Sequence, residues 1–225
     1  KRSDHMLMRL LLIFTLSFFA LFTHAVHAEP LPAQVHLNFV GPFQVPASMT
    51  FTHNNSEYRL ETTVNIPFKK MEFTSIGSVD GKRLITHSFT DIRGGKNYAS
   101  ARFDLTHKKI HYGRGEQNLS AEMTTLAQDF FTTAWQATLN HAPLNEKIQT
   151  TNGKKVYQRP PFVKVGEKEG YINGKRTPII LYASGEGDDR VELGLAPKEL
   201  FLPALIAYYE KGKRYELVLK SYSTK

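Results

Sequence analysis

The sequence predicts a mainly β protein, built as a curved antiparallel sheet or barrel of about ten or more strands with one amphipathic helix packed on or in it. Three observations support this fold class. Many short segments alternate apolar and polar residues, which is typical of antiparallel strands with one face in a core. Asn-Gly and Asp-Gly dipeptides, which favour tight hairpin turns, separate several of these segments. A single longer segment shows helical spacing instead.

Six alternating segments precede residue 106. In the first, Val35, Leu37 and Phe39 alternate with polar residues, and the later segments repeat this pattern. The segments cover residues 35–39, 49–51, 58–64, 71–75, 84–92 and 98–105. Turn-forming residues lie between them, including Asp80-Gly81, so we expect a meander in which each strand pairs with the next.

One helix is expected, beginning near residue 120 or 125 and ending near residue 140. Thr125 and Gln128 have the spacing of a capping box. Apolar residues then recur at helical spacing on one face: Met123, Leu126, Ala127, Phe130, Ala134 and Ala137. Phe131, Trp135 and Leu139 widen this face, which predicts a helix with a broad apolar surface.

Further strands are expected after the helix. They cover residues 148–157, 162–165, 177–183, 190–195, 204–209 and 215–222. Asn152-Gly153, Asn173-Gly174 and Lys211-Gly212 mark hairpin turns in this half. No repeat of solenoid or propeller type is visible.

The first 28 residues have the pattern of an export signal. We interpret residues 1–5 as a cloning remnant and residues 6–28 as a signal peptide, with Arg9 before an apolar run and Val26 and Ala28 at the cleavage site. Residues 29–225 are then a single β-rich domain, which we expect in the periplasm. The chain has no cysteine, which excludes disulfides, cysteine-based metal sites and a lipoprotein anchor.

Removal of residues 1–28 leaves 26 basic and 20 acidic residues, a net charge of +6. This moderate positive charge predicts weak attraction to anionic surfaces such as a membrane. Nucleic acid is not an expected partner, because no basic helix or nucleic-acid motif is present.

No motif for catalysis, cofactor binding or metal binding is recognisable. His107 and His111 have the spacing of zinc ligands on a helix, but they flank an expected strand, and Lys109 between them would oppose a cation. Ser184-Gly185 lacks the first glycine of a nucleophile elbow. The acidic segment 185–189 lacks the ligand series of a calcium loop and is interpreted as a loop between strands. We therefore predict that the protein is not an enzyme.

Two groups of residues are candidates for binding. Leu126, Phe130, Phe131 and Trp135 would line a cavity for an apolar ligand if the helix covers the curved sheet incompletely. The alternative is that all four are ordinary core residues beneath a helix that fills the sheet.

The second group consists of basic hairpin tips. Lys82, Arg83, Lys108 and Lys109 would share one end of a meander, with Lys96 at the other. They form a basic rim for anionic headgroups if they cluster. The alternative is that they are exposed tip residues that discourage edge-to-edge aggregation.

The C-terminal part of the chain resembles a known family. It contains Val-Glu-Leu-Gly-Leu-Ala-Pro at 191–197, then Leu202-Pro203 and the segment 215–219. With the expected signal peptide, meander and mid-chain helix, these features resemble the exported proteobacterial family catalogued as domain of unknown function 3108. The resemblance implies a fold and a compartment but no functional residues. The architecture is similar to periplasmic lipoprotein-carrier half-barrels, in which a sheet wraps on a helix.

These observations predict a non-enzymatic periplasmic binding or carrier module for an apolar or lipid-like ligand, without a cofactor. The alternative is a structural or interaction protein of the cell envelope that binds a protein partner through its surface or a sheet edge.

Overall fold

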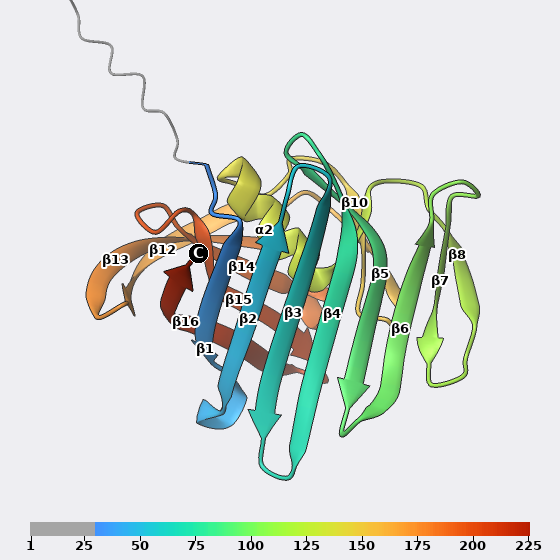
Figure 1. Cartoon of the computed structure of the whole chain (residues 1–225), viewed down its shortest axis with the longest axis horizontal. Helices are drawn as coiled ribbons and strands as arrows, with labels where there is room; N and C mark the ends of the chain where they lie inside the picture. The colour runs from blue at the N-terminus through green and yellow to red at the C-terminus, as the bar shows by residue number, and fades with distance from the viewer. Residues whose placement is uncertain (1–29) are drawn as a thin grey trace, which may run out of the picture. The chain divides into compact units, whose positions relative to one another are not determined.

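A thirteen-stranded antiparallel sheet forms most of the computed structural model, which describes residues 30–225 (Figure 1). Among these residues the sheet is accompanied by one α-helix, so the predicted mainly β class is confirmed. The predicted cloning remnant (1–5) and signal peptide (6–28) lie outside the described residues. Between residues 30 and 225, no helix is both long enough and apolar enough to cross a membrane.

The large sheet begins with the predicted meander and then joins the two ends of the chain. Its strands are β1 (Gln34–Val40), β2 (Pro46–His53), β3 (Glu57–Ile66), β4 (Lys69–Asp80), β5 (Arg83–Arg93), β6 (Lys96–Asp104), β7 (Lys109–Arg114), β8 (Leu119–Glu122), β12 (Val163–Ile172), β13 (Lys175–Ser184), β14 (Val191–Ala196), β15 (Leu202–Glu210) and β16 (Lys213–Thr224). Strands β1 to β8 pair consecutively, as do β12 to β16. The first strand, β1, pairs with the last, β16, and this pairing makes one continuous sheet from two meanders.

The sheet coils but does not close. Strands β12 and β8 are its two edges and do not pair with each other. The turn after β12 nevertheless reaches β16, four places away in the sheet order. The backbone N–H of Asn173 donates to the carbonyl of Lys220 at 2.9 Å, and the N–H of Tyr222 donates to Asn173 Oδ1 at 3.0 Å. Asn173 and Gly174 both have positive φ, as the Asn-Gly dipeptide predicts for a tight hairpin turn.

A small second sheet continues from the meander towards the helix. It consists of β9 (Ala127–Asp129), β10 (Ile148–Thr151) and β11 (Val156–Arg159). Strands β9 and β10 are parallel, and β10 and β11 form a hairpin. The predicted segment 148–157 is therefore two strands, which turn at Asn152-Gly153.

Helix α2 (Phe130–Asn140) begins later than predicted. The proposed capping box of Thr125 and Gln128 is wrong, because Gln128 belongs to β9. The true N-cap is Asp129, whose carboxylate accepts from the backbone N–H groups of Phe131 and Thr132 at 3.0 Å each. Leu126 accordingly lies outside the helix.

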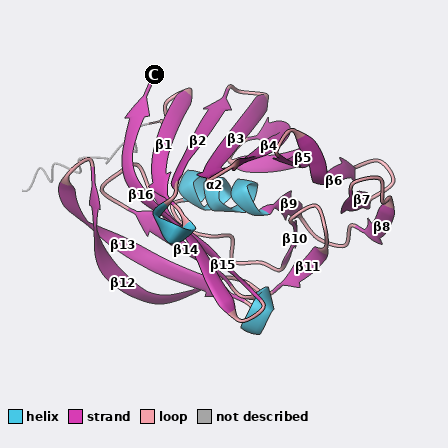
Figure 2. Cartoon of the chain, turned by 90° about the horizontal axis from the view of Figure 1, so that it is seen from below, coloured by secondary structure: helices cyan, strands magenta, loops and turns pink. Residues whose placement is uncertain are grey.

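The helix lies inside the coiled sheet. Figure 2 shows it between the early strands β1–β5 and the late strands β14–β15. The main core surrounds Trp135, which is fully buried and stacks on Phe51 with ring centroids 4.2 Å apart. The Trp135 indole N–H points to the sulfur of Met49 at 3.1 Å. Burial on both sides explains why the apolar face of the helix is broader than a single stripe.

Two buried glutamines fix the helix to the sheet. Gln136 accepts from the backbone N–H of Leu84 at 2.8 Å and donates to the carbonyl of Lys82 at 2.6 Å. Gln128 donates to the carbonyl of Leu84 at 2.8 Å. These bonds satisfy backbone groups at the start of β5 and set the position of α2 along the sheet.

Candidate functional site

The predicted ligand-binding residues do not share one environment. Trp135 is fully buried in the core, and Phe130, Phe131 and Leu126 are partly buried. Phe130 and Phe131 are the first residues of α2, and their rings lie 6.1 Å apart. Phe130 and Phe131 therefore lie together at the start of the helix. The structure does not bring Trp135 to a ligand cavity, since a bulky ring and a sulfur already fill the space around it.

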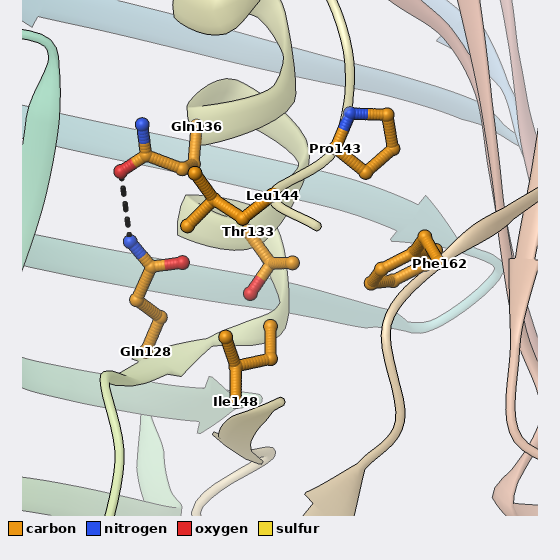
Figure 3. A pocket seen from close by; sticks show the side chains of 7 residues that line it. All are labelled: Gln128, Thr133, Gln136, Pro143, Leu144, Ile148 and Phe162. Carbon is orange, nitrogen blue, oxygen red and sulfur yellow. Dashed lines mark hydrogen bonds between the residues drawn. The ribbon is translucent and has the colours of Figure 1, made fainter. Parts of the chain in front are cut away.

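The space beside the helix is small and closed by side chains. The hollow is lined by Gln128, Thr133, Gln136, Pro143, Leu144, Ile148 and Phe162 (Figure 3). Its empty volume is about 190 Å³, but a water-sized sphere does not fit inside it. A drug-sized ligand needs a cleft of roughly 300 Å³ or more, so this hollow does not fit an acyl chain. A second hollow, on β1, β2 and the end of β16, has an empty volume of about 510 Å³, of which about 260 Å³ is open to a water-sized sphere, and it is lined by polar residues.

Aromatic side chains gather instead where α2 begins. Phe130 makes an edge contact with Tyr208 of β15, with ring centroids 6.4 Å apart. Tyr208 stacks on Tyr215 of β16 at 5.3 Å, and Phe131 packs on Phe73 of β4 at 5.2 Å. Tyr208 remains 42 % exposed. Four separate elements thus present a partly exposed row of rings.

Three cations surround the ring of Tyr98 on β6. The Arg93 guanidinium lies 3.6 Å from the centroid of the Tyr98 ring, and the charged groups of Arg114 and Lys154 lie at 5.4 and 5.9 Å. Arg93 also makes a two-pronged ion pair with the buried carboxylate of Asp91. We call the rings of Phe130, Phe131, Tyr208 and Tyr215, together with the Tyr98 cluster of Arg93, Arg114 and Lys154, the aromatic–cationic surface.

The charges of this surface act on Tyr208. Burial and the negative charge of Glu210 together raise the pKa of Tyr208 to about 12, against the opposing effect of Arg93. The Tyr208 hydroxyl therefore stays protonated at neutral pH and is a hydrogen-bond donor. Lys154 pairs with Glu210 at 3.5 Å. Three cations face two carboxylates here, which leaves a small positive excess next to exposed apolar rings.

The acidic segment 185–189, which the sequence predicts as a loop between strands, joins two other parts of the fold by hydrogen bonds. The carboxylate of Asp188 accepts from the backbone N–H groups of Lys211 and Gly212 at 2.9 and 2.8 Å. The buried guanidinium of Arg159 donates to the carbonyl of Asp189 and to the hydroxyl of Thr150. The loop therefore fastens the β15–β16 turn to the small sheet.

The predicted basic rim lies at the opposite end of the molecule. Lys82 lies in the β4–β5 turn and Arg83 begins β5, while Lys108 lies in the β6–β7 turn and Lys109 begins β7. The topology places both turns at one end of the sheet (Figure 1). Arg83 pairs with Glu146 at 3.0 Å, and Lys109 lies 4.0 Å from Glu122. These carboxylates weaken the field that the cations would share.

Tyr98, Arg93 and Tyr208 were not candidates from the sequence. They belong to β6, β5 and β15, so no local spacing links them. The available signal was Gly94-Gly95, which places Arg93 and Lys96 at a turn beside Tyr98. Pairing of β15 with β16 and of β16 with β1 then brings Tyr208 round to this region.

Comparison with known proteins supports the fold and leaves the chemistry open. No family model matches the chain, and no curated protein matches it. Among solved structures, the chain is similar to a β-barrel-like protein of domain of unknown function DUF1849 from Brucella abortus. The TM-score is 0.50 at 8 % sequence identity, over 87 % of this chain and 98 % of that chain.

The similarity defines a class of protein, a β-barrel-like fold of unknown function. At this identity it carries no information on ligand or residue roles. It does not extend to the family 3108 resemblance or to the lipoprotein carriers.

Proposed function

We propose that the chain is a non-enzymatic binding module of the periplasm for a lipid-like ligand that carries an anionic group. The ligand lies on the aromatic–cationic surface rather than in a deep cavity. The observation that carries this proposal is the exposed ring of Tyr208, which lies between Phe130 and Tyr215 and within the field of Arg93. Aromatic rings offer apolar area, and the cations beside Tyr98 attract an anion.

The filled interior supports a surface site. Trp135 and the small hollow beside α2 leave no room for an acyl chain. The proposal therefore keeps Phe130 and Phe131 from the sequence prediction and leaves out Trp135. Leu126 packs against the main core from the segment before β9, so the proposal leaves it out as well.

Calorimetric titration with decanoate, and with decanol as the uncharged comparison, tests this function. Phe130→Ser is expected to weaken binding of both compounds about tenfold, because it removes apolar contact area. Arg114→Gln is expected to weaken binding of decanoate only. Tyr171→Ser, on the distant edge strand β12, is the matched control, since Tyr171 is 65 % exposed and belongs to no cluster named above. No binding of decanoate by the wild type, or equal binding by Phe130→Ser, would contradict the proposal.

A second candidate function rests on strand β12. This strand is ten residues long and lies at the edge of the large sheet. Val163, Val165 and Tyr171 are strongly exposed on it. An exposed edge strand can accept a strand from another protein. Lys164, Glu167, Lys168 and Glu169 on the same strand would disfavour unspecific pairing and leave a charge pattern for a specific partner.

Co-purification from cell envelopes tests the second candidate. A partner held by β12 should be lost from Val163→Asp and kept by Phe130→Ser. Loss from both variants, or from neither, would argue against a role of this edge.

A further inference from the structure

Two hairpin turns at the same end of the sheet carry the same dipeptide. Pro42-Phe43 lies between β1 and β2, and Pro67-Phe68 lies between β3 and β4. Both turns are at the lower edge of Figure 1, because successive antiparallel strands return their odd-numbered turns to one end. Phe43 is 88 % exposed, and Phe68 is fully exposed. These are the most exposed large apolar side chains among the described residues.

Backbone geometry gives no reason for phenylalanine at these positions. Phe43 has a φ of 58° and Phe68 a φ of 65°, both in the left-handed region. Pro67 followed by Phe68 with positive φ is the pattern of a type II turn, in which glycine or asparagine is favoured at the second corner. In the β1–β2 turn, the N–H of Val45 donates to the carbonyl of Pro42 at 3.3 Å, and Phe43 and Gln44 both have positive φ. That is the pattern of a type I′ turn, whose two corners also favour glycine and asparagine. A phenylalanine there is strained and also leaves a large apolar ring in water. Both features oppose folding and solubility, so the rings serve another purpose.

The same end is basic. Lys69 and Lys70 follow Phe68, and Arg93 and Lys96 flank the next turn at this end. Lys70 pairs with Glu72, and Arg93 pairs with Asp91. Within residues 30–225, no carboxylate lies within ion-pair distance of Lys69 or Lys96. Exposed rings are thus accompanied by uncompensated positive charge.

The arrangement suits a flat anionic surface. The two turns are separated by two strands, which corresponds to roughly 10 Å at the usual strand spacing. Two rings at this separation can enter the same plane, and lysines just behind them can meet negative headgroups. Aromatic rings are favoured at the boundary between headgroups and acyl chains.

We propose that this end of the protein docks on an anionic lipid bilayer, with Phe43 and Phe68 inserted and with Lys69 and Lys96 contacting headgroups. The docking face lies at the end of the sheet opposite the basic rim that the sequence suggested. The inference does not depend on ligand binding at the aromatic–cationic surface, and either can hold without the other.

Co-sedimentation with vesicles tests the docking face. The probes are vesicles of phosphatidylethanolamine with phosphatidylglycerol, and uncharged vesicles of phosphatidylcholine. The variant Phe43→Asn/Phe68→Asn replaces both rings by a residue that accepts positive φ, so the turns are expected to form as before. Emission of Trp135, the single tryptophan, reports whether the core is intact in each variant.

The double variant is expected to bind the anionic vesicles about tenfold more weakly than the wild type. Lys69→Gln/Lys96→Gln should remove the preference for anionic over uncharged vesicles. The matched control is Leu105→Asn, since Leu105 is a 47 % exposed apolar residue at the opposite end, in the β6–β7 turn. It should bind as the wild type does.

Three results would overturn the proposal. The first is that the wild type fails to bind anionic vesicles, and the second is that the double phenylalanine variant binds them as strongly as the wild type. The third is that Lys82→Gln/Lys108→Gln abolishes binding while Lys69→Gln/Lys96→Gln does not, which would assign docking to the basic rim. Concentration-dependent dimerisation that the phenylalanine variant removes, without vesicle binding by the wild type, would assign the rings to a second copy of the chain.

Discussion

Replacing Asp129 tests how the helix is anchored inside the sheet. Asp129 is fully buried, and its carboxylate accepts from the backbone N–H groups of Phe131 and Thr132 and from the Thr132 hydroxyl at 2.5 Å. Asp129→Ala leaves these donors without a partner in the core. Loss of an N-cap costs up to about 2 kcal/mol, and each buried donor left unpaired costs roughly 1–3 kcal/mol. We therefore expect the free energy of unfolding to fall by about 3 kcal/mol or more.

Asp129→Asn is the matched variant, because its Oδ1 can still accept from both backbone N–H groups. It also cannot titrate. Burial raises the pKa of Asp129 above its ordinary value of 3.8, against the opposing effect of its bonds with Thr132. The folded chain therefore holds this proton more tightly than the unfolded chain does. The resulting stabilisation is complete below pH 3.8 and is lost as the pH rises through the raised folded value.

Urea unfolding, followed by the emission of Trp135 and by circular dichroism, measures both effects. The stability of the wild type minus that of Asp129→Asn should fall as the pH rises above 4. A cost below about 1 kcal/mol for Asp129→Ala would refute the cap argument. If the difference in unfolding free energy between the wild type and Asp129→Asn does not change between pH 4 and 8, the argument that burial raises the pKa of Asp129 is refuted.

Three further predictions concern the core and the surface. Trp135→Ala is expected to cost about 3–5 kcal/mol, and the partly exposed Phe131→Ala less, in the same urea assay; equal costs would contradict the core position of Trp135. Gly77→Ala should prevent folding as judged by circular dichroism, because a Cβ there would lie 2.0 Å from the carbonyl oxygen of Ile85, whereas Gly166→Ala has open space and should fold. Burial raises the pKa of Glu192, but the hydrogen bonds from Arg190 and Arg214 outweigh this effect and lower the pKa below its ordinary value. Glu192→Gln should therefore lower the free energy of unfolding by no more than about 1 kcal/mol at neutral pH. This difference from the wild type should vanish in acid, as Glu192 of the wild type becomes protonated.

Local signals predicted most of the fold. Alternation located β1 to β6 and β13 to β16, and Asp80-Gly81 and Asn173-Gly174 fall at turns. It found only the start of β12 and missed β8, which overlaps the region where the helix was expected to begin. The helix start was missed although its signal was present: Asp129 stands directly before the apolar run, where an N-cap is expected. The Thr125–Gln128 spacing imitated a capping box, and pairing of β9 with β10 took Gln128 instead. A parallel pairing between two short strands, such as β9 and β10, leaves no recognisable pattern in the sequence of either strand.

The candidate site could be predicted only in part, because it is assembled by long-range pairing. Phe130 and Phe131 stood out as an apolar helix face. Their neighbours Tyr208 and Tyr98 come from strands whose adjacency depends on the β16–β1 pairing and on the coil of the sheet. The exposed rings were missed for a different reason. Alternation suggests that phenylalanine in a β-rich chain is buried, and only the proline before Phe43 and Phe68 marks them as turn residues.

The two proposals converge on one end of the molecule. The β5–β6 turn carries Arg93 and Lys96, so the cluster around Tyr98 and the turn of Phe68 lie at the same end of neighbouring strands. If this end docks on a bilayer, the β15–β16 turn near Tyr208 lies at the docked end as well. Ligand transfer would then need no deep cavity, which agrees with a filled interior. Vesicles that contain decanoate separate the two: Phe43→Asn/Phe68→Asn should slow its uptake but leave its affinity in solution unchanged, while Phe130→Ser should lower the affinity and leave docking intact.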